Sequence, residues 1–199
     1  MFLHWAFLMS DQHPKPKSLK QLQKETPSRD AVLGRVAQTQ VEPDYEAALL
    51  SASLLEYMLM QAIRTKFISL GKDALESIFE TEGGPISTFS AKIKIAYALG
   101  IMTAPTKSQI ELIKSIRNHF AHHKDKCSFD EASIKSECAK LKQAKGLDQI
   151  PEPFKSQRKA GLTPKLKYTQ ACLWICVQLS MYVHIMETPG QISGPIDCI

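Results

Sequence analysis

The stretch of residues 44–70, DYEAALLSASLLEYMLMQAIRTKFISL, decides the fold. Its apolar residues recur at steps of three and four, which is the period of one face of an α-helix. They are Tyr45, Leu49, Ala52, Leu55, Met58, Leu59, Ala62, Ile63 and Phe67. Pro43 stands before this pattern and Gly71 follows it, so we expect one long amphipathic helix over residues 44–70.

Similar patterns predict further helices on the C-terminal side. We expect them over residues 73–82, from a cap at Ser87 or Thr88 through Leu99, from Pro105 to His122, and over residues 130–142 and 169–187. In the second of these, Phe89, Ile93, Ala96, Tyr97 and Leu99 should line one side, and Gly100 should end it. In the helix after Pro105, the buried stripe should be Ile110, Ile113, Ile116 and Phe120.

These elements predict an all-α fold, a bundle of about five or six helices. Nine glycines in 199 residues are few for an all-β protein, which needs frequent turns. We expect a flexible N-terminal segment over residues 1–40 and one helical domain over residues 41–199. A long basic loop over residues 140–167 should precede the last helix.

The cellular compartment follows from the cysteines and from the apolar segments. Five cysteines form an odd number without framework spacing, which favours a reducing cytoplasm over a disulfide scaffold. Residues 1–9 lack the basic region of a signal peptide. Residues 169–187 approach the length of a membrane span, but Gln170, Gln178, Ser180 and His184 interrupt them. We therefore expect a core helix and no membrane partner.

The net charge of +5 is concentrated in the predicted basic loop, where residues 140–167 carry eight Lys and Arg against two Asp and Glu. Such side chains could contact nucleic-acid phosphates. The candidates are Lys155, Arg158, Lys159, Lys165 and Lys167. A solvated loop that keeps the protein soluble is the alternative interpretation.

The densest polar cluster, Arg117, Asn118, His119, His122 and His123, ends the helix that carries the Ile110 stripe. An Arg followed five residues later by a His resembles the arrangement in helical RNases of the HEPN class. That resemblance implies His122 as general acid or base and Arg117 as the group that stabilises charge on phosphorus. Alternatively, these residues satisfy the helix C-terminus and bridge helices.

No cofactor or metal site is expected. Cys172 and Cys176 lie four apart on an apolar helix, with His184 two turns further on, but no carboxylate or second pair completes a metal site. Gly83 and Gly84 do not form a phosphate loop. No nucleophile elbow or dinucleotide fingerprint occurs in the sequence.

Two segments resemble the signature of the mannitol operon repressor family. They are residues 84–100, GPISTFSAKIKIAYALG, and residues 116–122, IRNHFAH, and the resemblance extends over roughly residues 44–123. The matching positions are Phe89, Ser90, Lys92, Lys94, Tyr97, Arg117, Asn118, Phe120, Ala121 and His122. The resemblance implies an all-helical regulator, although no helix-turn-helix is evident in this chain.

The signature also has a physical interpretation. Ser90, Lys92 and Lys94 alternate with apolar residues, so one helical face should pack while the other carries charge. Arg117 and Asn118 should bridge helices and fix the fold. A ligand or partner site at these residues is the alternative.

Three functions follow from these observations. We expect a transcriptional regulator without catalytic activity, acting through protein contacts or contacts with the phosphate backbone. An RNase or toxin of the HEPN type that uses Arg117 and His122 is the first alternative, and a helical scaffold for protein interaction is the second. A homo-oligomer, with a dimer as the default, is expected because symmetric dimers are the commonest assemblies.

Overall fold

The computed structural model describes residues 31, 34, 39, 41–123, 127–142, 162–188 and 194–197. Over the continuous ranges the regular elements are six α-helices, and no β-strand occurs there. The helices are α3 (Asp44–Arg64), α4 (Lys72–Phe79), α5 (Phe89–Ala98), α6 (Ala104–His122), α7 (Ala132–Ala139) and α8 (Pro164–Glu187). The predicted all-α class is therefore confirmed. Ala31, Gly34 and Thr39, within the predicted N-terminal segment, also have helical backbone.

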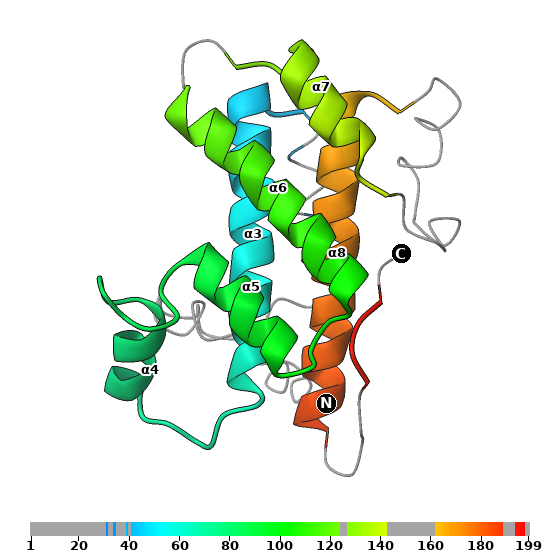
Figure 1. Cartoon of the computed structure of the whole chain (residues 1–199). Helices are drawn as coiled ribbons and strands as arrows, with labels where there is room; N and C mark the ends of the chain where they lie inside the picture. The colour runs from blue at the N-terminus through cyan, green and yellow to red at the C-terminus, as the bar shows by residue number, and fades with distance from the viewer. Residues whose placement is uncertain are drawn as a thin grey trace, which may run out of the picture.

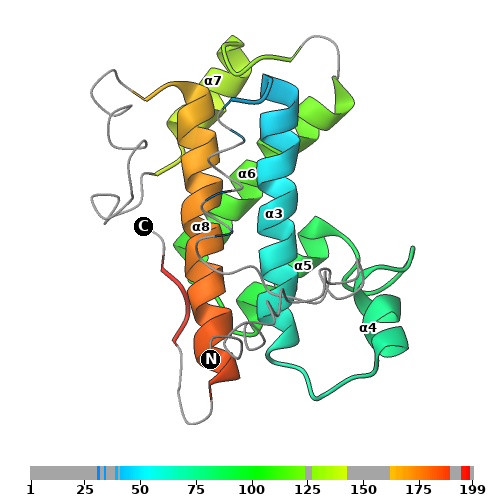
Figure 2. The same ribbon diagram turned by 180° about the vertical axis from the view of Figure 1, so that it is seen from behind.

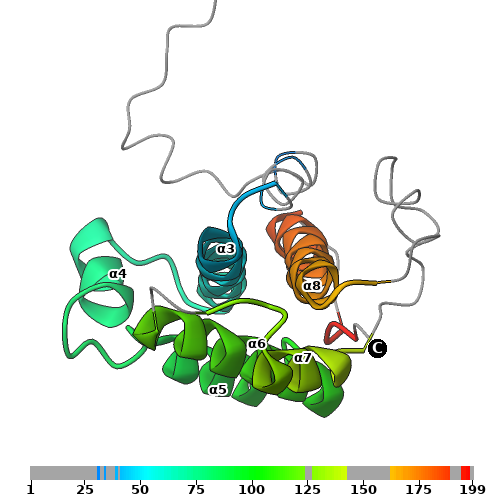
Figure 3. The ribbon, with the colours of Figure 1, turned by 90° about the horizontal axis from the view of Figure 1, so that it is seen from above.

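The helices form two layers with α4 at one side. Figure 3 shows α3 and α8 next to each other in one layer, with α5, α6 and α7 across them in the other. The two long helices run parallel (Figures 1 and 2). Near their starts Tyr168 Oη donates to Ala48 O at 3.0 Å, and near their ends Lys66 Nζ lies 5.7 Å from the Tyr182 ring centroid. The core lies between the layers.

Helix α8 is the described helix that is long and apolar enough to cross a membrane by length and composition alone. However, 67% of its most apolar window is buried inside the bundle. Its fully buried side chains include Tyr168, Cys172, Leu173, Cys176 and Leu179. A core helix of a globular protein has this character because it is covered on nearly all sides.

Local capping chemistry fixes the ends of α5. The Thr88 hydroxyl accepts a hydrogen bond from Ala91 N at 3.1 Å, as predicted for an N-cap. At the other end Ile101 N donates to Ala96 O and Gly100 N donates to Tyr97 O, both at 3.0 Å. This is the Schellman arrangement. Gly100 has a φ of +67°, which glycine adopts without the strain that a Cβ would cause.

The bounds of four helices differ from the prediction. Helix α3 ends at Arg64 rather than near residue 70, α4 covers Lys72–Phe79, and α7 covers only Ala132–Ala139. Helix α8 begins at Pro164, five residues before the predicted start. The Thr163 hydroxyl accepts from Leu166 N at 3.2 Å and Pro164 occupies the first turn, so this start signal lies upstream of the apolar pattern. The predicted basic loop is therefore shorter at its C-terminal end.

Two residues near the end of α5 are also placed differently. Tyr97 and Leu99 were expected on the packed side, but they are 43% and 38% exposed. The helix ends at Ala98, so Leu99 leaves the face that Phe89, Ile93 and Ala96 bury.

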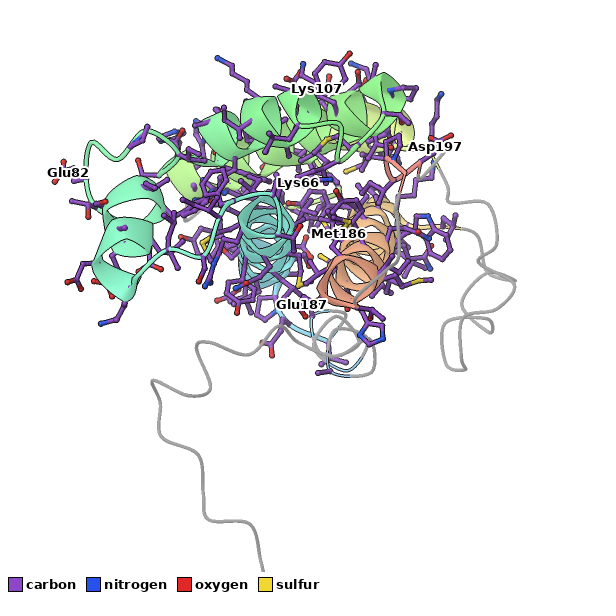
Figure 4. All side chains as sticks on the ribbon, turned by 90° about the horizontal axis from the view of Figure 1, so that it is seen from below. Lys66, Glu82, Lys107, Met186, Glu187 and Asp197 are labelled. Atoms are coloured by element: carbon purple, nitrogen blue, oxygen red, sulfur yellow. The ribbon has the colours of Figure 1, made fainter. Side chains whose placement is uncertain are left out.

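A C-terminal segment pairs with the connection between α5 and α6. Ile196 N donates to Ile101 O at 2.8 Å, and Thr103 N donates to Ile196 O at 3.1 Å. Thr103 Oγ1 also donates to Asp197 Oδ1 at 3.2 Å. This backbone pairing holds residues 194–197 against the start of α6, where Figure 4 labels Asp197.

Replacing Leu55 by Ala tests the core. Leu55 is fully buried in the centre of α3, so we expect Leu55→Ala to lower the free energy of unfolding by about 2–5 kcal/mol. Leu50→Ala is the matched control on the same helix, because Leu50 is 53% exposed. Its effect should stay within about 0.5 kcal/mol. Equal losses in the free energy of unfolding for Leu55→Ala and Leu50→Ala, measured by urea denaturation, would contradict the burial of Leu55 in the core.

Candidate functional site

One carboxylate joins three helices of the bundle. Glu56 of α3 accepts from Lys92 Nζ of α5 at 2.8 Å through Oε1 and from Arg117 Nη2 of α6 at 3.1 Å through Oε2. The side chains of Lys92, Glu56 and Arg117 are 7%, 20% and 26% exposed. We call these three residues the charged cross-link. It brings together two signature residues that lie 25 positions apart in the sequence.

The charged cross-link carries one more positive than negative charge, and neighbouring groups solvate the excess. Lys92 Nζ donates a second hydrogen bond to Ser87 O at 2.8 Å. Arg117 Nη1 donates to Asn118 Oδ1 at 3.0 Å, and its guanidinium carbon lies 5.7 Å from the Phe89 ring centroid. The ring face adds a cation–π attraction. The predicted bridging role of Arg117 agrees with this geometry.

The sequence predicted a different place for Lys92. It was expected on a charged face with Lys94, but the residue is only 6% exposed, whereas Lys94 is exposed. Helical periodicity assigns a lysine to the polar face by residue type. Here the aliphatic stem packs in the core and the ammonium meets a partner 36 residues earlier in the chain.

Glu56 was missed altogether, although the sequence contains a signal for it. It is the only charged residue in α3 between Glu46 and Arg64. An isolated acid among apolar positions indicates a buried partner, because an unpaired buried charge is costly.

The remaining signature residues divide into packed and exposed groups. Phe89 and Phe120 are buried, and the Phe120 ring packs against Phe129 with centroids 4.7 Å apart. The Ser90 hydroxyl accepts from Lys114 Nζ at 3.0 Å. By contrast, Tyr97 and His122 are exposed. Most of the signature therefore holds α5 and α6 in place.

The geometry of Arg117 and His122 bears on the RNase alternative. Five residues along a helix correspond to a rotation of about 140°, so the two side chains leave α6 in different directions. Arg117 is committed to Glu56 and Asn118, while His122 is exposed. Among the described residues, no hydrogen bond or ion pair joins these two side chains directly.

Three of the five basic candidates for phosphate contact, Lys155, Arg158 and Lys159, lie outside the described residues. Lys165 lies in the first turn of α8, where its Nζ donates to Glu42 O and lies 3.5 Å from Asp44 Oδ1. Lys167 is half-buried in the same helix. Part of the charge of Lys165 is thus neutralised within the protein.

The buried cysteines are poor nucleophiles. Burial raises the pKa of the Cys138 thiol to about 12. Burial also raises the pKa of Cys172, which contacts Tyr168. Because a thiol above its usual pKa stays protonated at neutral pH, these groups do not supply a thiolate.

The fold and the charged cross-link define an all-helical domain in which Glu56, Lys92 and Arg117 tie three helices together. Residues 28–180 match the sequence model of the family described as "Mannitol repressor" (MtlR). The chain therefore belongs to the MtlR family, as its signature predicted.

A solved structure has a similar fold. It is the X-ray structure of the MtlR-HPr complex from Escherichia coli, in which the matched chain is 21% identical, with a TM-score of 0.50. The match covers 80% of this chain and 98% of the other. No curated protein matches the chain.

The charged cross-link is tested by Glu56→Gln, which leaves Lys92 buried without its counter-ion. We expect a loss of about 3 kcal/mol in the free energy of unfolding, because breaking a buried pair strands a charge. Glu46→Gln, at an exposed acid of the same helix, should change it by less than about 0.5 kcal/mol.

The free energy of unfolding of the double variant Glu56→Gln, Lys92→Met gives a second test of the charged cross-link. Removing the stranded ammonium should recover part of the loss, because methionine keeps the apolar stem. If the loss in the double variant equalled the sum of the losses in Glu56→Gln and Lys92→Met, the result would contradict the ion pair between Glu56 and Lys92.

Proposed function

We propose that this protein is a regulator without catalytic activity that acts through contact with a partner protein of the HPr type. Its membership of the MtlR family supports a regulatory role. The Escherichia coli structure of similar fold is of a complex between MtlR and HPr, which supports a protein partner. The thiols of Cys127, Cys138 and Cys172, which form no disulfide, are in keeping with a cytoplasmic location.

The observation that carries the proposal is the exposure of Tyr97. It is the signature aromatic that the fold leaves accessible, at 43% exposed, while Phe89 and Phe120 are buried. Lys107 Nζ lies 5.7 Å from the Tyr97 ring centroid, and the same ammonium pairs with Glu111 at 2.8 Å. Figure 4 shows Lys107 on the outer side of the α5 and α6 layer. An aromatic ring with a charged rim has the composition of a binding hot spot.

A contribution from phosphate contacts remains a prediction that rests on Lys155, Arg158, Lys159 and Lys167. The predicted dimer is likewise a proposal, which sedimentation of the purified protein tests.

Titration calorimetry with purified HPr tests the proposed partner. We expect one HPr per chain, and Tyr97→Ala should weaken binding about thirtyfold, because truncating a hot-spot aromatic costs about 2 kcal/mol. Met181→Ala is the control, since Met181 is 46% exposed and belongs to α8, which lies in the other layer from α5 and α6 (Figure 3). HPr from the organism that encodes the chain and HPr from Escherichia coli should both be used.

Absence of binding to either HPr would contradict the proposed partner. Equal affinities of the Tyr97→Ala and Met181→Ala variants would contradict the proposed surface while leaving the partner intact.

The RNase alternative is tested separately with labelled RNA at low salt. We expect the RNA to remain intact with the wild type and with His122→Ala, because Arg117 is held by Glu56 rather than by a substrate phosphate. Cleavage by the wild type that is lost in His122→Ala would instead establish the enzyme and overturn the proposed function.

A further inference from the structure

Four side chains capable of binding a metal recur at steps of four residues around the end of α6. They are His119, His123, Cys127 and Glu131. One ligand atom from each of the first three lies within 4.8 Å of the others. His119 Nε2 lies 3.7 Å from Glu131 Oε2, so the fourth side chain borders the same group. This cluster is separate from the charged cross-link and from the Tyr97 surface.

The spacing of the donors is close to that of a tetrahedral zinc site. With zinc–nitrogen bonds near 2.0 Å and zinc–sulfur bonds near 2.3 Å, ligand atoms lie about 3.3–3.6 Å apart. The observed separations, none of which exceeds 4.8 Å, therefore need to contract by at most about 1.5 Å, which rotations about side-chain bonds supply. The two imidazoles already stack, with ring centroids 4.6 Å apart and an interplanar angle of 24°.

Hydrogen bonds prepare two of the ligands. His123 Nδ1 lies 3.0 Å from His119 O, and a carbonyl can only accept, so Nδ1 carries the proton and Nε2 keeps its lone pair. Metal-binding histidines are commonly oriented by this kind of contact. Glu131 Oε1 accepts from Ser128 N at 3.1 Å, which leaves Oε2 facing His119.

The segment that carries Cys127 and Glu131 is anchored to the core. Asp44 Oδ2 accepts from Ser128 Oγ at 2.9 Å and from Phe129 N at 3.0 Å. The Phe129 ring packs between Phe120 and Tyr168, with centroid distances of 4.7 and 5.4 Å. The same anchor fixes α6 through Phe120, so the two halves of the cluster are held on one rigid frame.

The cluster is also accessible. His123 is exposed, and His119, Cys127 and Glu131 are half-buried. A cation can therefore reach the donors from solvent without opening the bundle.

We propose that His119, His123 and Cys127, with the Glu131 carboxylate as fourth ligand, form a structural Zn²⁺ site. Two imidazoles and a thiolate favour a borderline-soft transition metal over Mg²⁺ or Ca²⁺, which prefer oxygen ligands. Four protein ligands leave no open position for a catalytic water. The metal would join the end of α6 to the start of α7, and its binding releases the thiol proton of Cys127 to solvent.

The sequence-based expectation of no metal site considered only Cys172 and Cys176. Both are buried in the core helix, whereas the new cluster combines a helix end with the chain beyond it. The four-residue spacing of His119, His123, Cys127 and Glu131 in the sequence could have indicated this cluster.

The test uses the full chain without a tag, stripped with a chelator and titrated with Co²⁺ as a spectroscopic probe of the zinc site. We expect saturation at one equivalent, with visible bands of tetrahedral cobalt and a charge-transfer band from the sulfur ligand. Zn²⁺ should displace the cobalt and bind with a dissociation constant at or below about 1 μM. It should also protect Cys127 from alkylation, which peptide mass spectrometry locates.

Variants separate the site from adventitious binding. Cys127→Ser should abolish the charge-transfer band, and His123→Ala should weaken zinc binding by about tenfold or more. His122→Ala is the matched control, because His122 is an exposed histidine at the same helix end but outside the cluster. It should bind as the wild type does. Circular dichroism of each variant checks that the fold is intact.

Two results would overturn the site. One is the absence of saturable cobalt binding by the wild type. The other is equal zinc affinity of the wild type, Cys127→Ser and His123→Ala, which would mean that the metal binds elsewhere. Neither result affects the proposed HPr contact, which uses different residues.

Discussion

The contact of Glu56 with Lys92 and Arg117 is the constraint on which the rest of the structure depends. Apolar packing alone specifies the position of α5 and α6 on α3 less sharply than an ion pair does, because hydrophobic contacts have little directionality. A carboxylate with one oxygen 2.8 Å from Lys92 and the other 3.1 Å from Arg117 fixes both helices at once. We infer that its main contribution is to the register of the two layers, since a buried ion pair gains little net stability over apolar packing.

This constraint also decides what the polar signature residues can do. A guanidinium that already donates to Glu56 and Asn118 keeps three of its five N–H donors, but those two acceptors fix its orientation and the carboxylate offsets its charge. The sequence alone could not distinguish a catalytic arginine from a bridging one, because both use the same residue at the same helical position. Because Arg117 holds helices together, the exposed side chains that could bind a partner or a metal lie at the two ends of α6. These are Tyr97 with Lys107 at its start and the histidines at its end.

Features encoded locally could be predicted from the sequence, and features that depend on distant partners could not. The cap at Thr88, the exit at Gly100 and the start near Pro105 follow from residues within one helical turn of each boundary. The burial of Lys92 depends on Glu56, 36 residues away. The start of α8 at Pro164 is also encoded locally. The sequence of its first turn indicated a loop because the side chains there are basic rather than apolar.

Helix α6 contributes residues to the charged cross-link, to the Tyr97 surface and to the proposed metal site, which raises the question of whether the last two influence each other. Lys107 and His119 are separated along the helix by about 18 Å, at a rise of 1.5 Å per residue. Coupling over that distance needs an element with two discrete arrangements that both sites bias. Arg117 ties α6 to α3, and Phe120 packs against Phe129 beside the histidines, so we expect the helix to keep one arrangement and to move as a rigid body. Metal at one end and a protein partner at the other should therefore bind independently.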